Sequence, residues 1–222
     1  MLAWIGVGLL VAAGGVGIRW MSARTDALGR PRPFPYITVV VLITVGCAAL
    51  APLVLRVRLE RRLETAASEL VGTSVEVRCQ SFGGAFVDVG ADLGYVVFGA
   101  DGRPEAWTLI KRQQCKDLSD YLSSDKQQPT RDQIIAVHVL SHETVHVTGI
   151  RDEAQTECKA MQLDAGMAAL LGASPQAAGE LAIAYWRDIY PWMPASYRSA
   201  ECIPGGALDA GRPDAPWTLA TS

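Results

Sequence analysis

Two long stretches without charge limit what this chain can fold into more than any other feature does. Residues 1–18 (MLAWIGVGLLVAAGGVGI) and 36–55 (YITVVVLITVGCAALAPLVL) contain no Asp, Glu, Lys or Arg. At a rise of about 1.5 Å per residue, a helix of either length can cross the roughly 30 Å apolar core of a bilayer. We therefore predict a two-helix membrane hairpin over residues 1–55, followed by a domain outside the bilayer.

The first stretch has an alternative interpretation as a cleaved signal peptide, which needs a basic start and a small-residue cleavage site. The chain begins Met-Leu-Ala-Trp, without a basic residue, so a membrane helix is the preferred interpretation. Pro52 lies near the end of the second stretch. It would kink or end the helix there, which membrane helices tolerate.

The charges that flank the apolar stretches leave the orientation of the hairpin open. Four arginines lie within residues 19–32 and four within residues 56–62. Because an excess of Lys and Arg marks the cytoplasmic side, equal numbers favour neither orientation. The net charge of the chain is -3, and this acidic balance does not suggest a nucleic-acid surface. The expected partner of the apolar stretches is a lipid bilayer, and the sequence indicates no oligomeric state.

The cysteines give a better indication of the compartment. Cys47 lies in an apolar stretch, which leaves Cys79, Cys115, Cys158 and Cys202 in the domain. An even number outside the cytosol predicts two disulfides, and we expect neighbours in sequence to pair, Cys79 with Cys115 and Cys158 with Cys202. The alternative is four buried thiols in a cytosolic domain. We predict a multi-pass protein of the cell membrane with an extracytoplasmic C-terminal domain.

The rest of the chain predicts an α+β domain over residues 71–205. Residues 56–70 favour a solvated helical stalk, and residues 206–222, rich in glycine and proline, a flexible tail. Short β-rich runs separated by glycines predict a small antiparallel sheet. The expected strands are SVEVRC (74–79), AFVDV (85–89), GYVVF (94–98) and WTLI (107–110). The expected helices are a short one that holds Cys115, then 131–148, 153–172 and 174–190.

The second of these helices, 131–148, carries the motif His142-Glu143-Thr144-Val145-His146, the HExxH pattern of zinc proteases. Thr130 and Gln133 form a capping-box pattern at the expected start of its helix, and Gly149 is a typical residue just past the end. Two histidines four apart share one helix face and can bind one Zn²⁺. Glu143 lies beside them, where it can accept a proton from water at the metal.

A catalytic zinc needs a third protein ligand, for which Asp152, Glu153 and Glu157 are the candidates. Asp152 also suits the N-cap of the next helix. If Glu153 is the ligand, Glu157 would hold a histidine in its working tautomer. Folding two helices about a turn near residues 150 and 151 places Glu157 opposite residue 144 instead. A glutamate is favoured, and Asp152 is the fallback.

Other polar residues have less defined roles. His138, one turn before His142, is either a buried residue satisfied locally, a group that supports a ligand, or a ligand itself. Peptide hydrolysis also needs a donor for the oxyanion. Candidate donors are Tyr185, Tyr190, Tyr197 and Arg198, none of which lies in a recognisable motif.

The segment HETVHVTGIRDEAQTEC (residues 142–158) resembles the core of gluzincin-type HExxH proteins, found as uncharacterised membrane or secreted proteins of actinobacteria. The resemblance is good over residues 138–158 and loose over 70–205. It implies a small zincin-like metallopeptidase domain in which His142 and His146 bind zinc and Glu143 is catalytic. The second motif of gluzincins has the form ExxxD, and residues 153–157 of this chain have the similar form ExxxE. Unlike in well-studied gluzincins, HExxH and this second motif are very close together, and Glu157 stands where those proteins have Asp.

Two functions fit these patterns. The first is a membrane-anchored zinc-dependent peptidase, with Glu143 as the general base for a zinc-activated water. Its expected partner is a peptide or protein substrate. The second is a non-catalytic extracytoplasmic binding module with a structural or vestigial zinc site. An intramembrane protease is excluded by placement, because the HExxH segment lies in a polar helix well past Leu55.

Overall fold

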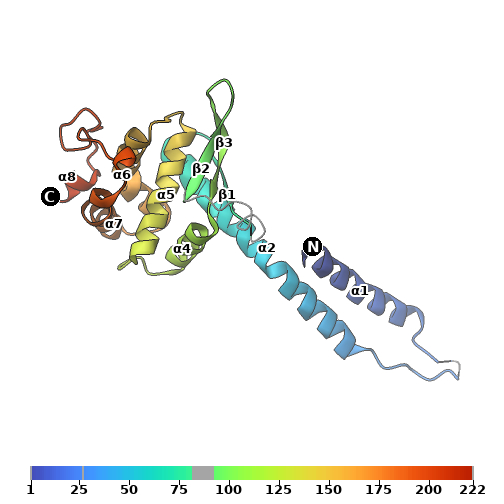
Figure 1. Ribbon diagram of the computed structural model, residues 1–222. Helices are drawn as coiled ribbons and strands as arrows, with labels where there is room; N and C mark the ends of the chain where they lie inside the picture. Colours follow the sequence, from blue (N-terminus) through green and yellow to red (C-terminus); the bar gives the residue numbers. More distant parts are fainter. Residues whose placement is uncertain (1, 27, 82–92, 222) are drawn as a thin grey trace. The chain divides into compact units, whose positions relative to one another are not determined.

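The computed structural model of the protein (Figure 1) describes residues 2–26, 28–81 and 93–221. It divides into two compact units, residues 1–58 and 59–222. The element order is mixed α and β: two long helices, a small three-stranded sheet and then a helical region. This confirms the α+β class, and each unit is described in turn.

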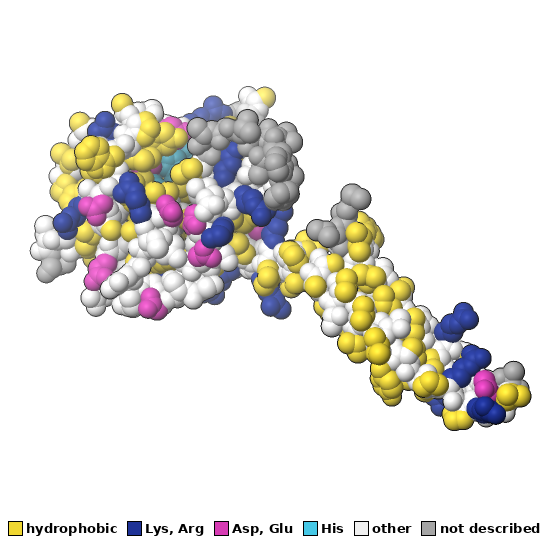
Figure 2. Space-filling model, turned by 60° about the horizontal axis from the view of Figure 1, so that its bottom comes forward, with side chains coloured by type: hydrophobic (Ala, Val, Ile, Leu, Met, Phe, Trp, Pro, Cys, Tyr) yellow, Lys and Arg dark blue, Asp and Glu magenta, His cyan; other side chains and the backbone are white. Residues whose placement is uncertain are grey.

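The first unit contains helix α1 (Leu2–Ser22) and the first part of helix α2 (Tyr36–Val71). By length and composition, both are apolar enough to cross a membrane, and very few residues of their apolar windows are buried. Helix α2 continues through Pro52. In Figure 2, hydrophobic side chains cover the visible face of this unit, and arginines gather at the turn between its helices.

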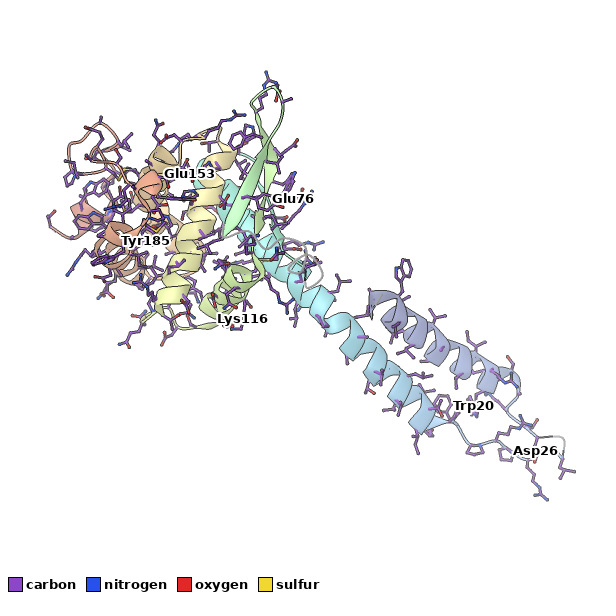
Figure 3. All side chains as sticks on the ribbon, in the orientation of Figure 1. Trp20, Asp26, Glu76, Lys116, Glu153 and Tyr185 are labelled. Carbon is purple, nitrogen blue, oxygen red and sulfur yellow. A yellow bond between two sulfur atoms is a disulfide. The ribbon has the colours of Figure 1, made fainter. Side chains whose placement is uncertain are left out.

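Within this unit, α1 and α2 approach closely at two glycines. A Cβ added to Gly6 would lie 3.0 Å from the carbonyl oxygen of Gly46, and one added to Gly46 would lie 3.1 Å from the carbonyl oxygen of Gly6. Small residues allow such backbone approach between helices. At the turn, labelled in Figure 3 by Trp20 and Asp26, the Trp20 indole N–H donates to the Arg32 carbonyl at 3.0 Å.

The second unit contains a sheet of strands β1 (Glu76–Cys79), β2 (Gly94–Phe98) and β3 (Pro104–Ile110), in the order β1-β3-β2. Strand β2 pairs antiparallel with β3, whereas β1 pairs parallel with it. The sheet is therefore mixed, and the expectation of an antiparallel sheet was wrong. The expectation failed because turn signals specify the direction of neighbouring strands only in the hairpin β2–β3. The direction of β1 depends on the longer connection between β1 and the hairpin. The expected strand 85–89 lies outside the described residues.

Four helices follow the sheet, close to their predicted spans: α4 (Arg112–Ser123), α5 (Arg131–Val147), α6 (Glu153–Leu170) and α7 (Pro175–Asp188). Helix α5 lies between the sheet on one side and α6 and α7 on the other (Figure 1). Its residues from Ala136 to Val147 are all buried. The chain then continues through η1 (Tyr190–Trp192), η2 (Ala195–Tyr197) and α8 (Pro216–Leu219).

Two segments differ from their expected character. The predicted stalk, residues 56–70, ends in a helical stretch whose Leu63, Ala66 and Ala67 are buried in the core. These residues form an apolar stripe at helical spacing among charged neighbours. Trp217 in α8 is only 4% exposed, although residues 206–222 were expected to be flexible. Its burial beside Trp186, 6.2 Å away between ring centroids, fixes this part of the tail.

Both expected disulfides are present. Cys79–Cys115 joins the end of β1 to α4, and Cys158–Cys202 joins α6 to the segment after η2. Disulfides of this kind are typical of domains outside the cytosol, so they agree with an extracytoplasmic location for the second unit.

Candidate metal centre

Local hydrogen bonds determine where α5 and α6 begin and end. The Thr130 hydroxyl accepts from the Gln133 N–H, and the Gln133 side chain accepts from the Thr130 N–H, which completes the predicted capping box. Gly149 has a φ of +100°, a conformation that glycine adopts at little cost. Asp152 then caps α6 by accepting from the Gln155 N–H at 2.8 Å. The carboxylate of Asp152 is therefore engaged as a helix cap.

The turn brings three potential ligand atoms together. His142 Nε2 lies 3.0 Å from His146 Nε2 and 3.1 Å from Glu153 Oε2, and His146 Nε2 lies 3.5 Å from Glu153 Oε2. Bonds of about 2.0–2.1 Å at tetrahedral angles would place zinc ligands about 3.3 Å apart. This triangle has that size, so His142, His146 and Glu153 form a group that could hold a metal ion.

The other ring nitrogens show why this group attracts a cation. His146 Nδ1 lies 2.7 Å from the Ile150 carbonyl oxygen, and His142 Nδ1 lies 2.9 Å from Glu157 Oε2. Because a carbonyl and a carboxylate only accept hydrogen bonds, both Nδ1 atoms carry hydrogen. In a neutral ring, Nε2 then carries a lone pair that can bind a metal. Both Nε2 atoms face the carboxylate oxygen Oε2 of Glu153, which carries lone pairs as well.

The pKa shifts agree with this interpretation. Hydrogen bonds from His142 and His146 lower the pKa of Glu153 to about 2. Burial lowers the pKa of His142, but its hydrogen bonds to Glu153 and Glu157 outweigh burial and raise it overall. These hydrogen bonds place a proton between a histidine ring and Glu153. A metal ion would compete with that proton for the same site.

A second group of possible ligands, His138, His142 and Glu157, lies deeper. Glu157 Oε2 is 3.0 Å from His138 Nε2, and the Tyr185 hydroxyl donates to Glu157 Oε1 at 2.5 Å. Figure 3 labels Tyr185 on α7 and Glu153 on α6. The side chain of Glu157 is 1% exposed, compared with 40% for Glu153. Glu157 thus lies at the closed end of the cluster and Glu153 at the open end.

The open end faces a cavity of about 820 Å³. Figure 2 shows the histidine side chains in a hollow bordered by hydrophobic ones. Glu143 lines this cavity, and a Cβ added to Gly94 would lie 2.8 Å from Glu143 Cγ and 3.0 Å from its Oε1. Strand β2 therefore packs directly on the acid of the motif. The apolar wall includes Val96, Phe98, Ile135, Val139, Ile189, Trp192 and Met193.

Of the four candidate oxyanion donors, Tyr185 and Tyr197 both line the cavity. Tyr197 lies next to the motif. Its ring centroid lies 5.7 Å from that of His142. Tyr185, Tyr190 and Arg198 form hydrogen bonds that point their polar atoms elsewhere. Their partners are Glu157 for Tyr185, Ser199 for Tyr190 and Pro191 for Arg198.

Sequence reasoning missed two residues of this site, Gly94 and Asp164. Asp164 Oδ2 lies 2.8 Å from His138 Nδ1, and Asp164 is fully buried. Its spacing from Glu153 and Glu157 on α6, eleven and seven residues, places all three acids on one helix face. That spacing was a usable signal. Gly94 was indicated only as the first residue of an expected strand.

Comparisons with protein-family models, curated proteins and solved structures found no match to this chain. The site is therefore defined by its own residues: a buried His and Glu cluster on two antiparallel helices, able to hold a metal at the edge of an apolar cavity.

Proposed function

We propose that this chain is a zinc-dependent peptidase of the zincin type, anchored to a membrane by its N-terminal hairpin. The observation that carries the proposal is the convergence of three lone-pair donors, His142 Nε2, His146 Nε2 and Glu153 Oε2, beside Glu143 at the edge of a cavity. Two imidazoles and one carboxylate are a common ligand set of catalytic zinc. Three protein ligands next to open space favour a catalytic site over a closed structural one.

Zinc bound there would supply a Lewis acid that activates water and polarises the carbonyl group of a peptide. Glu143 would accept a proton from the attacking water at its carboxylate and deliver it to the leaving amine nitrogen. The hydroxyl of Tyr197 would donate to the carbonyl oxygen as negative charge develops on it. Glu157, through its bond to His142 Nδ1, would fix the tautomer and orientation of that ligand.

The membrane anchor is supported by the two apolar helices and the location by the two disulfides. The disulfides favour a substrate outside the cytosol. The cavity has a mainly apolar wall, which suits a peptide or an exposed segment of a protein with apolar side chains near the cleaved bond.

The test is metal content and peptide hydrolysis by the full chain, purified in detergent micelles with zinc in the buffer. We expect about one zinc per chain and cleavage of a mixed peptide library. Glu143→Gln should retain zinc and lose at least about 100-fold in rate, since it removes the general base. His142→Ala/His146→Ala should lose zinc. If the wild-type chain binds zinc but shows no cleavage beyond that of Glu143→Gln, the non-catalytic binding module is the correct function.

A further inference from the structure

His138 lies one turn before the motif and is not one of the three proposed ligands, yet it is only 2% exposed. Both of its ring nitrogens face carboxylates: Nδ1 is 2.8 Å from Asp164 Oδ2, and Nε2 is 3.0 Å from Glu157 Oε2. Ionised carboxylates only accept hydrogen bonds, so both nitrogens donate and the ring is a cation. It stacks on Tyr185 at 3.6 Å between centroids and 12° between planes.

This cation completes the hydrogen bonding of Glu157. Oε2 accepts from His138 Nε2 and His142 Nδ1, and Oε1 accepts from the Tyr185 hydroxyl. The carboxylate is thereby fixed from three sides, and one of its donors carries a full positive charge. A buried carboxylate without such a cation is costly, because neutral donors alone do not balance its charge.

We propose that His138 and Asp164 are positioning residues, which hold Glu157 against His142 Nδ1 and so aim His142 Nε2 at the metal site. Asp164 fixes His138, His138 fixes Glu157, and Glu157 fixes His142. The inference rests on the proposed function for its metal, and it assigns the deeper group of His138, His142 and Glu157 to support of the site.

Geometry favours this role over a second metal site. A metal at the deeper group would replace the hydrogen bonds of Glu157 to His138 and His142, which have good lengths of 3.0 and 2.9 Å. It would also have to displace the proton of His138 Nε2 next to two carboxylates. The three potential ligand atoms of the outer group, in contrast, lie within 3.5 Å of one another at the open end of the cluster, where the side chain of Glu153 is 40% exposed.

The test compares zinc affinity of the full chain in micelles, by competition with a chromophoric chelator, for wild type and four variants. His138→Gln should bind zinc about 10–100-fold more weakly, the usual effect of losing an outer-shell partner. Asp164→Asn, which keeps the shape and the acceptor but removes a charge, should weaken binding less. Glu153→Gln should lose more than either. Ser141→Ala is the matched control: Ser141 is buried on the same helix, its hydroxyl donates to the Val137 carbonyl of that helix, and affinity should not change.

Unchanged affinity in both His138→Gln and Asp164→Asn would overturn the positioning role. Complete loss of zinc in His138→Gln, with near-normal binding by Glu153→Gln, would instead make His138 a ligand. If His138→Gln does not fold, Asp164→Asn decides the question. The Co²⁺-substituted wild type should show two ligand imidazole N–H resonances, from His142 and His146, and a third would contradict the assignment.

A metal-free readout separates this inference from the proposed function. In the apoprotein, ¹⁵N-edited NMR should show a slowly exchanging proton on His142 Nδ1, and His138→Gln should accelerate its exchange with solvent. That result in a chain that binds no zinc would refute the peptidase but retain the positioning role. Zinc binding by the wild type, with the Nδ1 proton unaffected by His138→Gln, would refute only the positioning role.

Discussion

Substituting Gly94 by alanine tests whether strand β2 sets the position of the proposed general base. The added Cβ would lie 2.8 Å from Glu143 Cγ and 3.0 Å from both Cδ and Oε1 of Glu143. Carbon atoms in good contact are about 3.5–4.0 Å apart, so the side chain of Glu143 would have to retreat by roughly 0.7–1.2 Å. A displacement of about 1 Å in a catalytic group can cost on the order of 100-fold in rate.

The assay for Gly94→Ala is peptide hydrolysis alongside zinc content. We expect a loss of about 10–100-fold in kcat with zinc retained, because Glu143 is not a proposed ligand. Overpacking would also destabilise the fold by about 1–3 kcal/mol, measurable by denaturant unfolding. Gly99→Ala is the control: its Cβ would crowd only the exposed Asp101 carboxylate, at 2.9 Å, which can rotate away. Wild-type kcat in Gly94→Ala would refute the claim that this contact positions Glu143.

Two further predictions concern the core and pH. Leu63→Ala should destabilise the second unit by about 2–5 kcal/mol in denaturant unfolding, since Leu63 is fully buried. A change near zero would instead support the interpretation of residues 56–70 as a solvated stalk. Burial lowers the pKa of His138, but the charges of Asp164 and Glu157 outweigh it and raise the pKa to about 10. The stability from this raised pKa is fully present below about pH 6.5, the unfolded value, and is lost as the pH rises through about 10. The ¹⁵N shifts of His138 should therefore show both nitrogens protonated at pH 8, and a neutral ring at that pH would contradict the assignment.

Features with a local physical cause were predictable from the sequence. The capping box of Thr130 and Gln133, the positive φ of Gly149 and the cap at Asp152 each depend on residues within a few positions. Each satisfies backbone groups that the end of a helix leaves unpaired. Hence the spans of α5 and α6, which carry the candidate site, were correct to within two residues.

Features that depend on residues far away in the sequence were not predictable. The parallel pairing of β1 with β3 joins residues about thirty apart, and no turn signal between them specifies it. Burial of Leu63 follows from a helical stripe that is interrupted by arginines and glutamates. That stripe was readable only once the sheet and helices that cover it were in place.

The arrangement of the acids depends on both the local sequence of each helix and the packing of α5 against α6. Helix α5 presents His138, His142 and His146 at intervals of four residues, and α6 runs antiparallel to it. Glu157 lies against His138 and His142, and not opposite residue 144 as the expected turn would have placed it. This places Glu153 beside the two Nε2 atoms.

The exposure of the three acids on α6 decreases from the open end of the cluster to its closed end. The side chain of Glu153 is 40% exposed, that of Glu157 1% and that of Asp164 0%. An ionised carboxylate at the exposed end can bind a metal ion at modest cost, whereas the two buried ones need a fixed cation between them. His138 supplies that cation. One pair of helices, each with a repeat of ionisable residues on one face, thus forms an accessible group that could hold a metal ion. The buried acids and His138 lie where the proposed positioning role needs them.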